Sequence, residues 1–163
     1  MMADGFVSVS RRIEAAPEVL FALLADSGNH PLIDGSGMVR VPAPAVRVSR
    51  TGDSFLMKMH HDRFGDYQMR NEVVEYEHGR RLTWEPTRVA GTPEEQAELG
   101  DPPHYRWGWE LSPDGPGATT VTETFDCTRS PGDLRAAVKE GEGWLRAMTE
   151  SLIKLELLAK AVG

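Results

Sequence analysis

The chain has 163 residues, a usual size for one domain with one core, and its 40% hydrophobic and 26% charged residues are typical of a globular protein rather than a disordered one. A net charge of -7, with no segment that clusters Lys and Arg with aromatic residues, argues against nucleic acid as a partner. No apolar run approaches the roughly 20 residues of a membrane span, and Met1 to Val9 lacks the pattern of a secretion signal, so we expect a cytoplasmic protein.

The first predicted elements are one strand and two short helices. Residues 6–13 alternate between apolar and polar, the period of a half-buried strand, although Arg11 interrupts the apolar positions. Proline suits the first turn of a helix, and the apolar residues of 17–25 then follow helical spacing. A second helical turn begins at 29–31, and the glycines of 34–37 end it.

A series of strands follows. Residues 38–48 are ambiguous, because Pro42 and Pro44 favour an edge strand or an extended segment. From Ser54 the alternation is clear and predicts a hairpin with its turn at 63–65. Further strands are predicted around 82–84, 105–111 and 121–127, and all of them are expected to be sequential and antiparallel.

An acidic segment containing proline, 87–103, interrupts this meander. Thr92 followed by Pro93 resembles a helix start with a threonine cap, so 93–99 is expected to form one or two exposed turns. A connection of this length is often functional. Both a surface insertion and a lid over a cavity remain open.

The C-terminal segment predicts one long amphipathic helix. A capped helix entry at 130–133 precedes Gly141 and Gly143, which are expected to break or kink the helix before its main part, 144–162. There an apolar stripe follows three- and four-residue spacing. About 20 residues at 1.5 Å each span roughly 30 Å, enough to cross a sheet. Cys127, the only cysteine, cannot form an internal disulfide and is expected to be a small buried side chain.

The order of elements predicts an α+β fold: a curved antiparallel sheet of about six or seven strands wrapped around a long C-terminal helix, with two short helices after the first strand. A sheet of this size twists and curls, and one helix laid across its concave face does not fill the hollow. This geometry predicts an internal cavity. The alternative is that the same side chains fill the space as a solid core.

The chain resembles the SRPBCC or START-like superfamily, and more closely its polyketide cyclase/dehydrase and lipid-transport branch. The segments that carry the resemblance span nearly the whole chain: 9–11, 13–19, 30–37, 69–76, 81–84, 107–111 and 119–126. The resemblance implies the helix-grip fold as a single domain, 1–163. Members of the superfamily include aromatic-polyketide cyclases, lipid carriers and hormone receptors, so the fold constrains function weakly.

The apolar positions that face one way along the strands and the helix predict the lining of the cavity. The expected ligand-binding residues are Phe55, Met57, Met59, Tyr67, Met69, Val73, Trp84, Tyr105, Trp107, Trp109, Phe125, Met148 and Leu152, and Leu82 and Val121 share the same parity. Methionine adapts to irregular shapes, and Trp and Tyr offer flat contacts with one polar tip. This lining suits an aromatic or lipid-like ligand.

Three polar residues are candidates for chemistry. Glu123 and Asn71 fall on the inward parity, and a carboxyl group in an apolar pocket has the raised pKa of a general acid or base. The alternatives are that Glu123 reaches water or an arginine and that Asn71 caps a backbone group. His61 could act at the cavity mouth or lie on a solvated hairpin, and His60 beside it points to the opposite face, so we expect no metal site. The segment 30–37 we interpret mainly as structure.

These features predict a protein that binds a small hydrophobic or aromatic molecule, polyketide-, lipid- or sterol-like, as a carrier or sequestering protein. One alternative is a polyketide cyclase or dehydratase that uses Glu123, Asn71 or His61 to move a proton. Another is a dimeric regulatory or assembly protein with a vestigial cavity. We expect no cofactor, no nucleic acid and no membrane span, and a homodimer remains possible.

Overall fold

The structure, a computed structural model, describes residues 4–42, 44–63 and 65–163. Seven strands form one antiparallel sheet in the order β1-β7-β6-β5-β4-β3-β2. Their bounds are β1 (Phe6–Ile13), β2 (Val39–Pro42), β3 (Ser54–His61), β4 (Gly65–Glu77), β5 (Arg81–Val89), β6 (Arg106–Pro113) and β7 (Thr119–Asp126). Phe64, in the middle of the predicted turn at 63–65, lies outside the described residues. The predicted antiparallel sheet is confirmed, and β2, which ends at Pro42, is one of its two edge strands.

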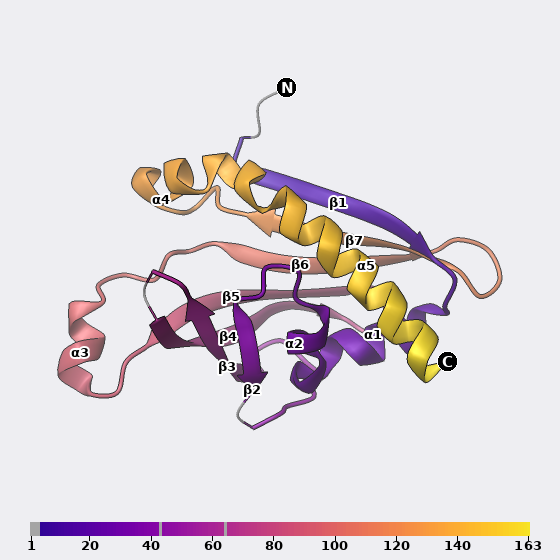
Figure 1. The fold of residues 1–163 in the computed structure, drawn as a ribbon, viewed down its shortest axis with the longest axis horizontal. Coiled ribbons are helices and arrows are strands. Elements are labelled where there is room, and N and C mark those ends of the chain that lie inside the picture. Colours follow the sequence, from indigo (N-terminus) through magenta and orange to yellow (C-terminus); the bar gives the residue numbers. More distant parts are fainter. Residues whose placement is uncertain (1–3, 43, 64) are drawn as a thin grey trace.

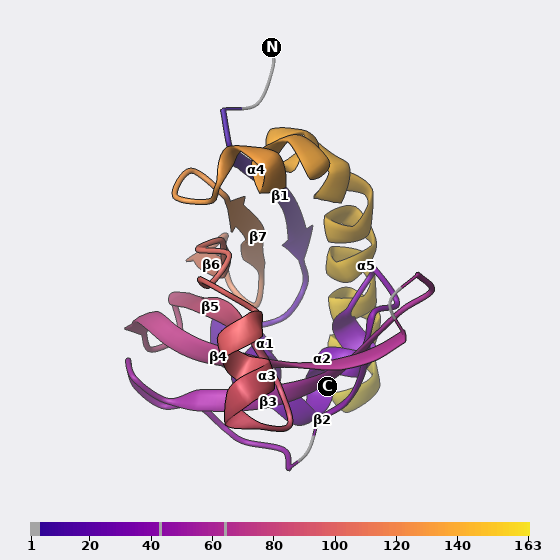
Figure 2. The same ribbon diagram turned by 90° about the vertical axis from the view of Figure 1, so that its left-hand side faces the viewer.

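Five α-helices accompany the sheet in the described part of the chain: α1 (Pro17–Ala25), α2 (His30–Ile33), α3 (Pro93–Glu98), α4 (Gly132–Ala137) and α5 (Leu145–Val162). Short 3-10 turns at Ser27–Asn29 and Lys139–Trp144 precede α2 and α5. Viewed from one end, the sheet curls from β1 and β7 round to β3 and β2, and α5 closes the open side (Figures 1 and 2). This is the helix-grip arrangement. None of these helices is both long enough and apolar enough to cross a membrane.

Backbone strain marks the entry to α5. Glu140 and Gly141 have φ angles of 56° and 100°, so the chain breaks between α4 and α5, as the two glycines predicted. A Cβ on Gly141 would lie 3.1 Å from Val7 and 3.3 Å from the ring of Phe125. Glycine therefore serves both the positive φ and the close packing at this turn.

The buried core lies under the C-terminal half of α5. Leu155 of α5, Leu20 of α1, and Leu82 and Val121 of the sheet are fully buried there in one cluster. A smaller cluster of Val7, Phe125, Cys127 and Met148 lies near the start of α5, and Cys127 is buried as expected. The helix thus seals one half of the concave face by direct packing.

Two departures from the predicted elements concern β5 and β6. Strand β5 continues to Val89, which pairs with Gln68 of β4, so the connection predicted from residue 87 begins at Ala90. Pairing between β5 and β6 stops at Trp84 and Trp107. Pro86 has no N–H to extend that ladder, and the two strands separate beyond this point.

Candidate functional site

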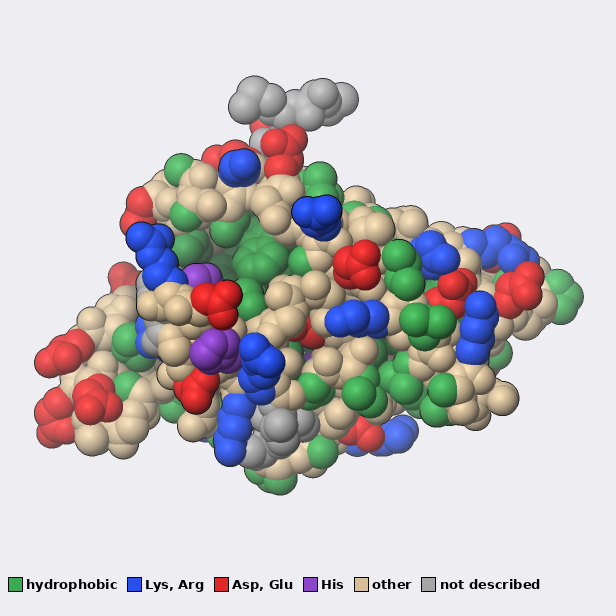
Figure 3. Space-filling view, viewed as in Figure 1, with side chains coloured by type: hydrophobic (Ala, Val, Ile, Leu, Met, Phe, Trp, Pro, Cys, Tyr) green, Lys and Arg blue, Asp and Glu red, His purple; other side chains and the backbone are tan. Residues whose placement is uncertain are grey.

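A cavity lies beneath the N-terminal half of α5, beside the point where Met148 packs onto the sheet. The cavity has a volume of about 170 Å³. It opens to the surface as a hollow whose floor is made of hydrophobic side chains (Figure 3). The side chains that line it are Leu24, His30, Ile33, Asp34, Ser36, Met38, Val39, Phe55, Met57, Met59, Tyr67, Met69, Asn71, Trp84, Pro86, Tyr105, Trp107, Trp109, Glu123, Trp144, Ala147, Met148 and Ser151.

Two residue types are concentrated in this wall. All four tryptophans of the chain line the cavity, and so does every methionine except Met1 and Met2. The ring of Trp107 contacts that of Trp144 edge-on, with 5.3 Å between centroids. Flat rings give the wall a fixed part, whereas unbranched thioether side chains change rotamer at low cost and give it an adaptable part.

Most of the sequence-predicted binding residues line the cavity, but Val73, Phe125 and Leu152 do not. These three are 1% exposed and lie in the two buried clusters behind the wall. Leu82 and Val121, which share the inward parity, also lie in the main buried cluster and not in the cavity wall. Side-chain alternation identifies the face of a strand but not the position along it. Helix α1 and the C-terminal half of α5 cover one part of that face, and the turn before α5 covers the part around Phe125.

His61 does not line the cavity. It is the last residue of β3, where its Nδ1 accepts a hydrogen bond from the backbone N–H of Arg63 at 3.0 Å. Its neighbour His60 pairs with Asp66 across the hairpin, at 2.8 Å from Nδ1 to the carboxylate. Among the described residues, no group of three His, Cys, Asp or Glu side chains comes close enough together to hold a metal ion.

The carboxyl group of Glu123 lies inside the cavity wall and is 7% exposed. Residue 123 faces inward from β7, with Val9 and Trp109 beside it on the neighbouring strands. Its Oε2 is buried without a hydrogen-bond partner among the described residues. Burial, with a smaller contribution from the nearby charge of Asp34, raises the pKa of Glu123 well above its ordinary value. The sequence alternative, in which Glu123 reaches an arginine, is not seen.

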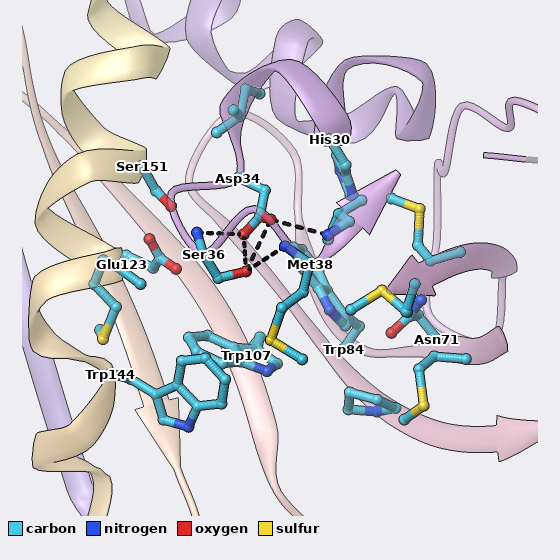
Figure 4. A pocket seen from close by; sticks show the side chains of 18 of the residues that line it. His30, Asp34, Ser36, Met38, Asn71, Trp84, Trp107, Glu123, Trp144 and Ser151 are labelled. Atoms are coloured by element: carbon cyan, nitrogen blue, oxygen red, sulfur yellow. Dashed lines mark hydrogen bonds between the residues drawn. The ribbon is translucent and has the colours of Figure 1, made fainter. Parts of the chain in front are cut away.

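Opposite Glu123, the loop from α2 to β2 folds around the carboxylate of Asp34 (Figure 4). This carboxylate accepts hydrogen bonds from the backbone N–H and hydroxyl of Ser36, and from the backbone N–H of Val39 at 3.0 Å. The loop is attached to α5 by two bonds: Gly35 N–H to Ser151 Oγ at 2.8 Å and Lys154 Nζ to the Asp34 carbonyl at 2.9 Å. Asp34 is therefore held in place by donors on two sides.

His30 forms part of the wall from α2. Its ring stacks on Trp84 at 5.2 Å and meets Phe55 edge-on at 5.1 Å. Nε2 donates to the carbonyl of Leu24 at 2.8 Å, which leaves Nδ1 as the acceptor nitrogen. Burial lowers the pKa of His30, opposed in part by the bond to Leu24, so the ring is neutral near pH 7.

The remaining polar groups of the wall are neutral donors and amides. Asn71 is 4% exposed, and its Nδ2 makes one long bond, 3.5 Å, to the carbonyl of Phe55. Burial raises the pKa of Tyr67, and raises that of Tyr105 to about 12, so both phenols stay protonated. Trp144 Nε1–H is buried without a partner among the described residues.

Sequence reasoning missed the contribution of the loop and of the helix entry. The sequence pattern indicates a structural role for the segment that holds His30, Asp34 and Ser36, and it does not identify Trp144 or Ser151 as lining residues; the structure places all five in the cavity wall. Irregular loops have no period that identifies the inward side. The one available signal was the glycine at position 35, where a Cβ would overlap the Ala147 carbonyl and so requires close contact between loop and helix.

Segment 90–103 does not line the cavity. Its helix α3 has no buried residue and begins at the predicted cap, where Thr92 Oγ1 accepts from Glu95 N–H at 3.1 Å. Gln96 links the helix back to β5 through the carbonyl of Arg88 at 3.0 Å. In this structure the segment is a surface insertion rather than a closed lid.

Solved structures share this fold at low sequence identity. Protein Ms6760 from Mycobacterium smegmatis is similar with a TM-score of 0.69 and 12% identity, over 98% of this chain and 94% of the other. Protein CV1439 from Chromobacterium violaceum gives 0.67 and 17% over 95% and 96%. DynU16, a protein of the dynemicin biosynthetic locus, gives 0.59 and 23%, over 94% of this chain and 48% of that one.

Among curated proteins, the chain is 39% identical over 122 residues to uncharacterized proteins from two strains of Mycobacterium tuberculosis, MT0096 and Rv0088. The match covers 72% of this chain and 46% of each relative, so the chain spans about half the length of those proteins. The profile of one family matches residues 6–160. The chain belongs to the family described as polyketide cyclase / dehydrase and lipid transport.

Proposed function

We propose that the protein binds one small hydrophobic or aromatic molecule in the cavity beneath α5, as a carrier or sequestering protein. The observation that carries this proposal is the wall itself: an unfilled space of about 170 Å³ that collects all the tryptophans. Large apolar side chains around an empty space lose the contacts that a filled core would give them. A ligand restores those contacts.

The size of the cavity limits the ligand. An apolar cavity of about 150 Å³ in another protein holds one benzene molecule. A body of one or two rings, or a short acyl chain, therefore suits the enclosed space of about 170 Å³. A longer molecule requires rotamer changes in Met38, Met57, Met59 or Met69, or extends through the opening. The family description, which includes lipid transport, supports a ligand of this kind.

A cyclase- or dehydratase-type enzyme is the second candidate, and Glu123 is the observation that favours it. A carboxyl group kept neutral by burial can donate a proton to a ligand carbonyl and take one back from a neighbouring carbon. Asn71 lies in the same wall and would orient a ligand oxygen. In this function the cavity would fold a poly-carbonyl substrate and Glu123 would move the proton.

Mass spectrometry of the purified protein tests the proposal. We expect extracts of the wild-type protein to contain a small apolar molecule in near-stoichiometric amount. The matched control is Ala147→Leu, which fills the cavity from α5 and should retain far less of the molecule. A molecule present equally in both proteins would be surface-bound and would contradict the proposal.

The molecule identified in these extracts also distinguishes the carrier function from the enzyme function. A retained molecule that the wild type returns unchanged supports the carrier, whereas one that the wild type converts and Glu123→Gln does not supports the enzyme. The dimeric alternative remains a prediction of its own: it requires a solution mass of twice 18.0 kDa, which light scattering measures directly.

A further inference from the structure

The cavity has an acidic wall without a basic partner. Glu123 and Asp34 both line it, and in the described part of the chain no Lys or Arg does. Glu123 Oε2 is buried and accepts no hydrogen bond from the described residues. Buried carboxyl groups in proteins are normally paired, so an unpaired one facing a ligand-sized space points to a partner that comes with the ligand.

Two basic residues lie near Glu123 but outside the cavity wall. Arg11 lies on the same face of the sheet, one strand away; one terminal nitrogen of its guanidinium pairs with Glu156 of α5 at 3.0 Å, and its buried Nε has no partner among the described residues. Lys154, also on α5, donates to the carbonyl of Asp34. Neither side chain lines the cavity. The described residues therefore supply no cation to the wall that holds Glu123 and Asp34.

The other titratable groups near this space carry no positive charge. His30 on α2 uses its only ring proton in the bond to the Leu24 carbonyl. Tyr67 of β4 and Tyr105 before β6 are half-buried phenols that also line the cavity. From α5, the group that lies near Glu123 is the hydroxyl of Ser151 (Figure 4).

The surrounding rings also favour a cation. Trp84, Trp107, Trp109 and Trp144 line the same cavity, and the π-face of an indole attracts an ammonium group. The combination of aromatic walls with a carboxylate is the usual arrangement for binding an amine in an enclosed site. A ligand carboxylate would instead meet the negative charge of Asp34 and no cation to balance its own charge, and its binding would be disfavoured.

We propose that the ligand of this cavity carries a basic amine, which binds as an ammonium ion beside Glu123 in the field of Asp34, while its apolar body lies among the tryptophans. This inference rests on the proposed function and narrows its ligand class. It excludes fatty acids and other free carboxylic acids as occupants.

The protons balance as follows. Burial disfavours the charged form of Glu123, so in the free protein its carboxyl group holds a proton more tightly than it would in water. The amine enters with the proton it already carries in water, and Glu123 releases its own proton to the solvent. The bound state is an ion pair, and binding of the amine releases protons to the solution.

Three isosteric probes test the inference by titration calorimetry at pH 7: 2-naphthylmethylamine, 2-naphthylmethanol and 2-naphthoate. They share one apolar body and differ in charge. We expect the amine to bind at least tenfold more tightly than the alcohol, and the naphthoate to bind more weakly than either. Titrations in two buffers of different ionisation enthalpy should show release of protons on binding of the amine and none on binding of the alcohol.

Glu123→Gln should reduce the ratio of amine to alcohol affinity to about one and abolish proton release. The matched control is Glu72→Gln, which changes an exposed glutamate of β4 on the outer face of the sheet and should leave the ratio unchanged. If Glu123→Gln does not fold, the wild type still tests the inference, because binding that releases a proton from Glu123 must strengthen as the pH rises from 5 toward neutrality.

The outcomes separate the inference from the proposed function. Tight binding of the alcohol with no preference for the amine overturns the inference and leaves the binding function standing. Failure of all three probes to bind overturns both. A preference for the naphthoate overturns the assignment of an acidic cavity.

Discussion

The backbone N–H of Gly35 donates to the hydroxyl of Ser151 at 2.8 Å, and this bond joins the loop after α2 to the helix that covers the sheet. The two segments lie so close that a Cβ at position 35 would overlap the Ala147 carbonyl and lie 2.7 Å from Ser151 N. Both obstacles are backbone atoms, which cannot rotate away. The loop carries Asp34 and Ser36 into the cavity wall, so this contact determines the shape of the site.

Gly35→Ala should therefore displace the loop and weaken binding of an apolar probe at least fivefold. We expect it to lower the free energy of unfolding by about 1–3 kcal/mol, the range for overpacking a close contact. Probe titration and urea denaturation measure the two effects. Gly132→Ala, where a Cβ meets nothing within 4 Å, is the control and should change neither. Wild-type affinity in Gly35→Ala would show that the loop does not shape the site.

Replacing Ala147 by leucine tests whether the cavity is the binding site. The side chain of Ala147 lines the cavity from α5, and three added heavy atoms there occupy space that the ligand needs. We expect probe affinity to fall at least tenfold while stability changes by less than about 1.5 kcal/mol. Ala161→Leu, at an exposed position near the end of the same helix, should bind the probe as the wild type does.

The fold could be predicted from the sequence because its strands alternate cleanly. The same alternation placed Glu123 and Asn71 among inward apolar residues, where the structure has them. Alternation could not distinguish Val73 and Phe125, which are buried in the core, from the side chains that line the cavity. It shows which face of the sheet a residue is on, but not whether a helix or turn covers that part of the face.

The loop after α2 was beyond the reach of periodicity. His30 and Asp34 enter the wall because hydrogen bonds to Leu24, Ser36 and Val39 fix an irregular backbone, and none of these contacts has a repeating pattern. Contacts of this kind depend on the tertiary structure.

Titration of Glu123 should make the free energy of unfolding depend on pH. Its pKa is raised in the folded protein, so the folded state binds the proton more tightly than the unfolded chain does. The stabilisation is fully present below pH 4.5, the ordinary value, and is lost as the pH rises through the folded pKa. Each pKa unit of the shift corresponds to about 1.4 kcal/mol.

Glu123→Gln removes this dependence, because glutamine does not titrate. The free energy of unfolding of the variant minus that of the wild type should be larger at pH 8 than at pH 4.5. Urea unfolding at both pH values measures this difference. Glu72→Gln serves as the exposed control. An identical pH profile for wild type and Glu123→Gln would mean that folding does not raise the pKa of Glu123.

His30 should contribute in the opposite pH direction. Burial lowers its pKa, so the unfolded chain binds a proton near pH 6.5 that the folded protein excludes. The wild type should therefore lose stability as the pH falls below 6.5, and His30→Ala should lack this part of the loss.

At neutral pH, His30→Ala should lower the free energy of unfolding by about 2–4 kcal/mol, because it removes the ring between Phe55 and Trp84 and leaves the Leu24 carbonyl unpaired. His61→Ala, at the end of β3 and away from the cavity wall, should leave probe binding within twofold of the wild type. Loss of probe binding in His61→Ala would show that His61 takes part in ligand binding.

The most direct measurement uses the four tryptophans, since every one of them lines the cavity. Their indole N–H signals can be followed by ¹H–¹⁵N NMR while 2-naphthylmethanol is added. If the cavity is a binding site, the indole signals of Trp84, Trp107, Trp109 and Trp144 shift together and saturate at one equivalent, while amide signals from α3 stay in place. Indole signals that do not move at millimolar probe, in a protein that remains folded, would contradict the account.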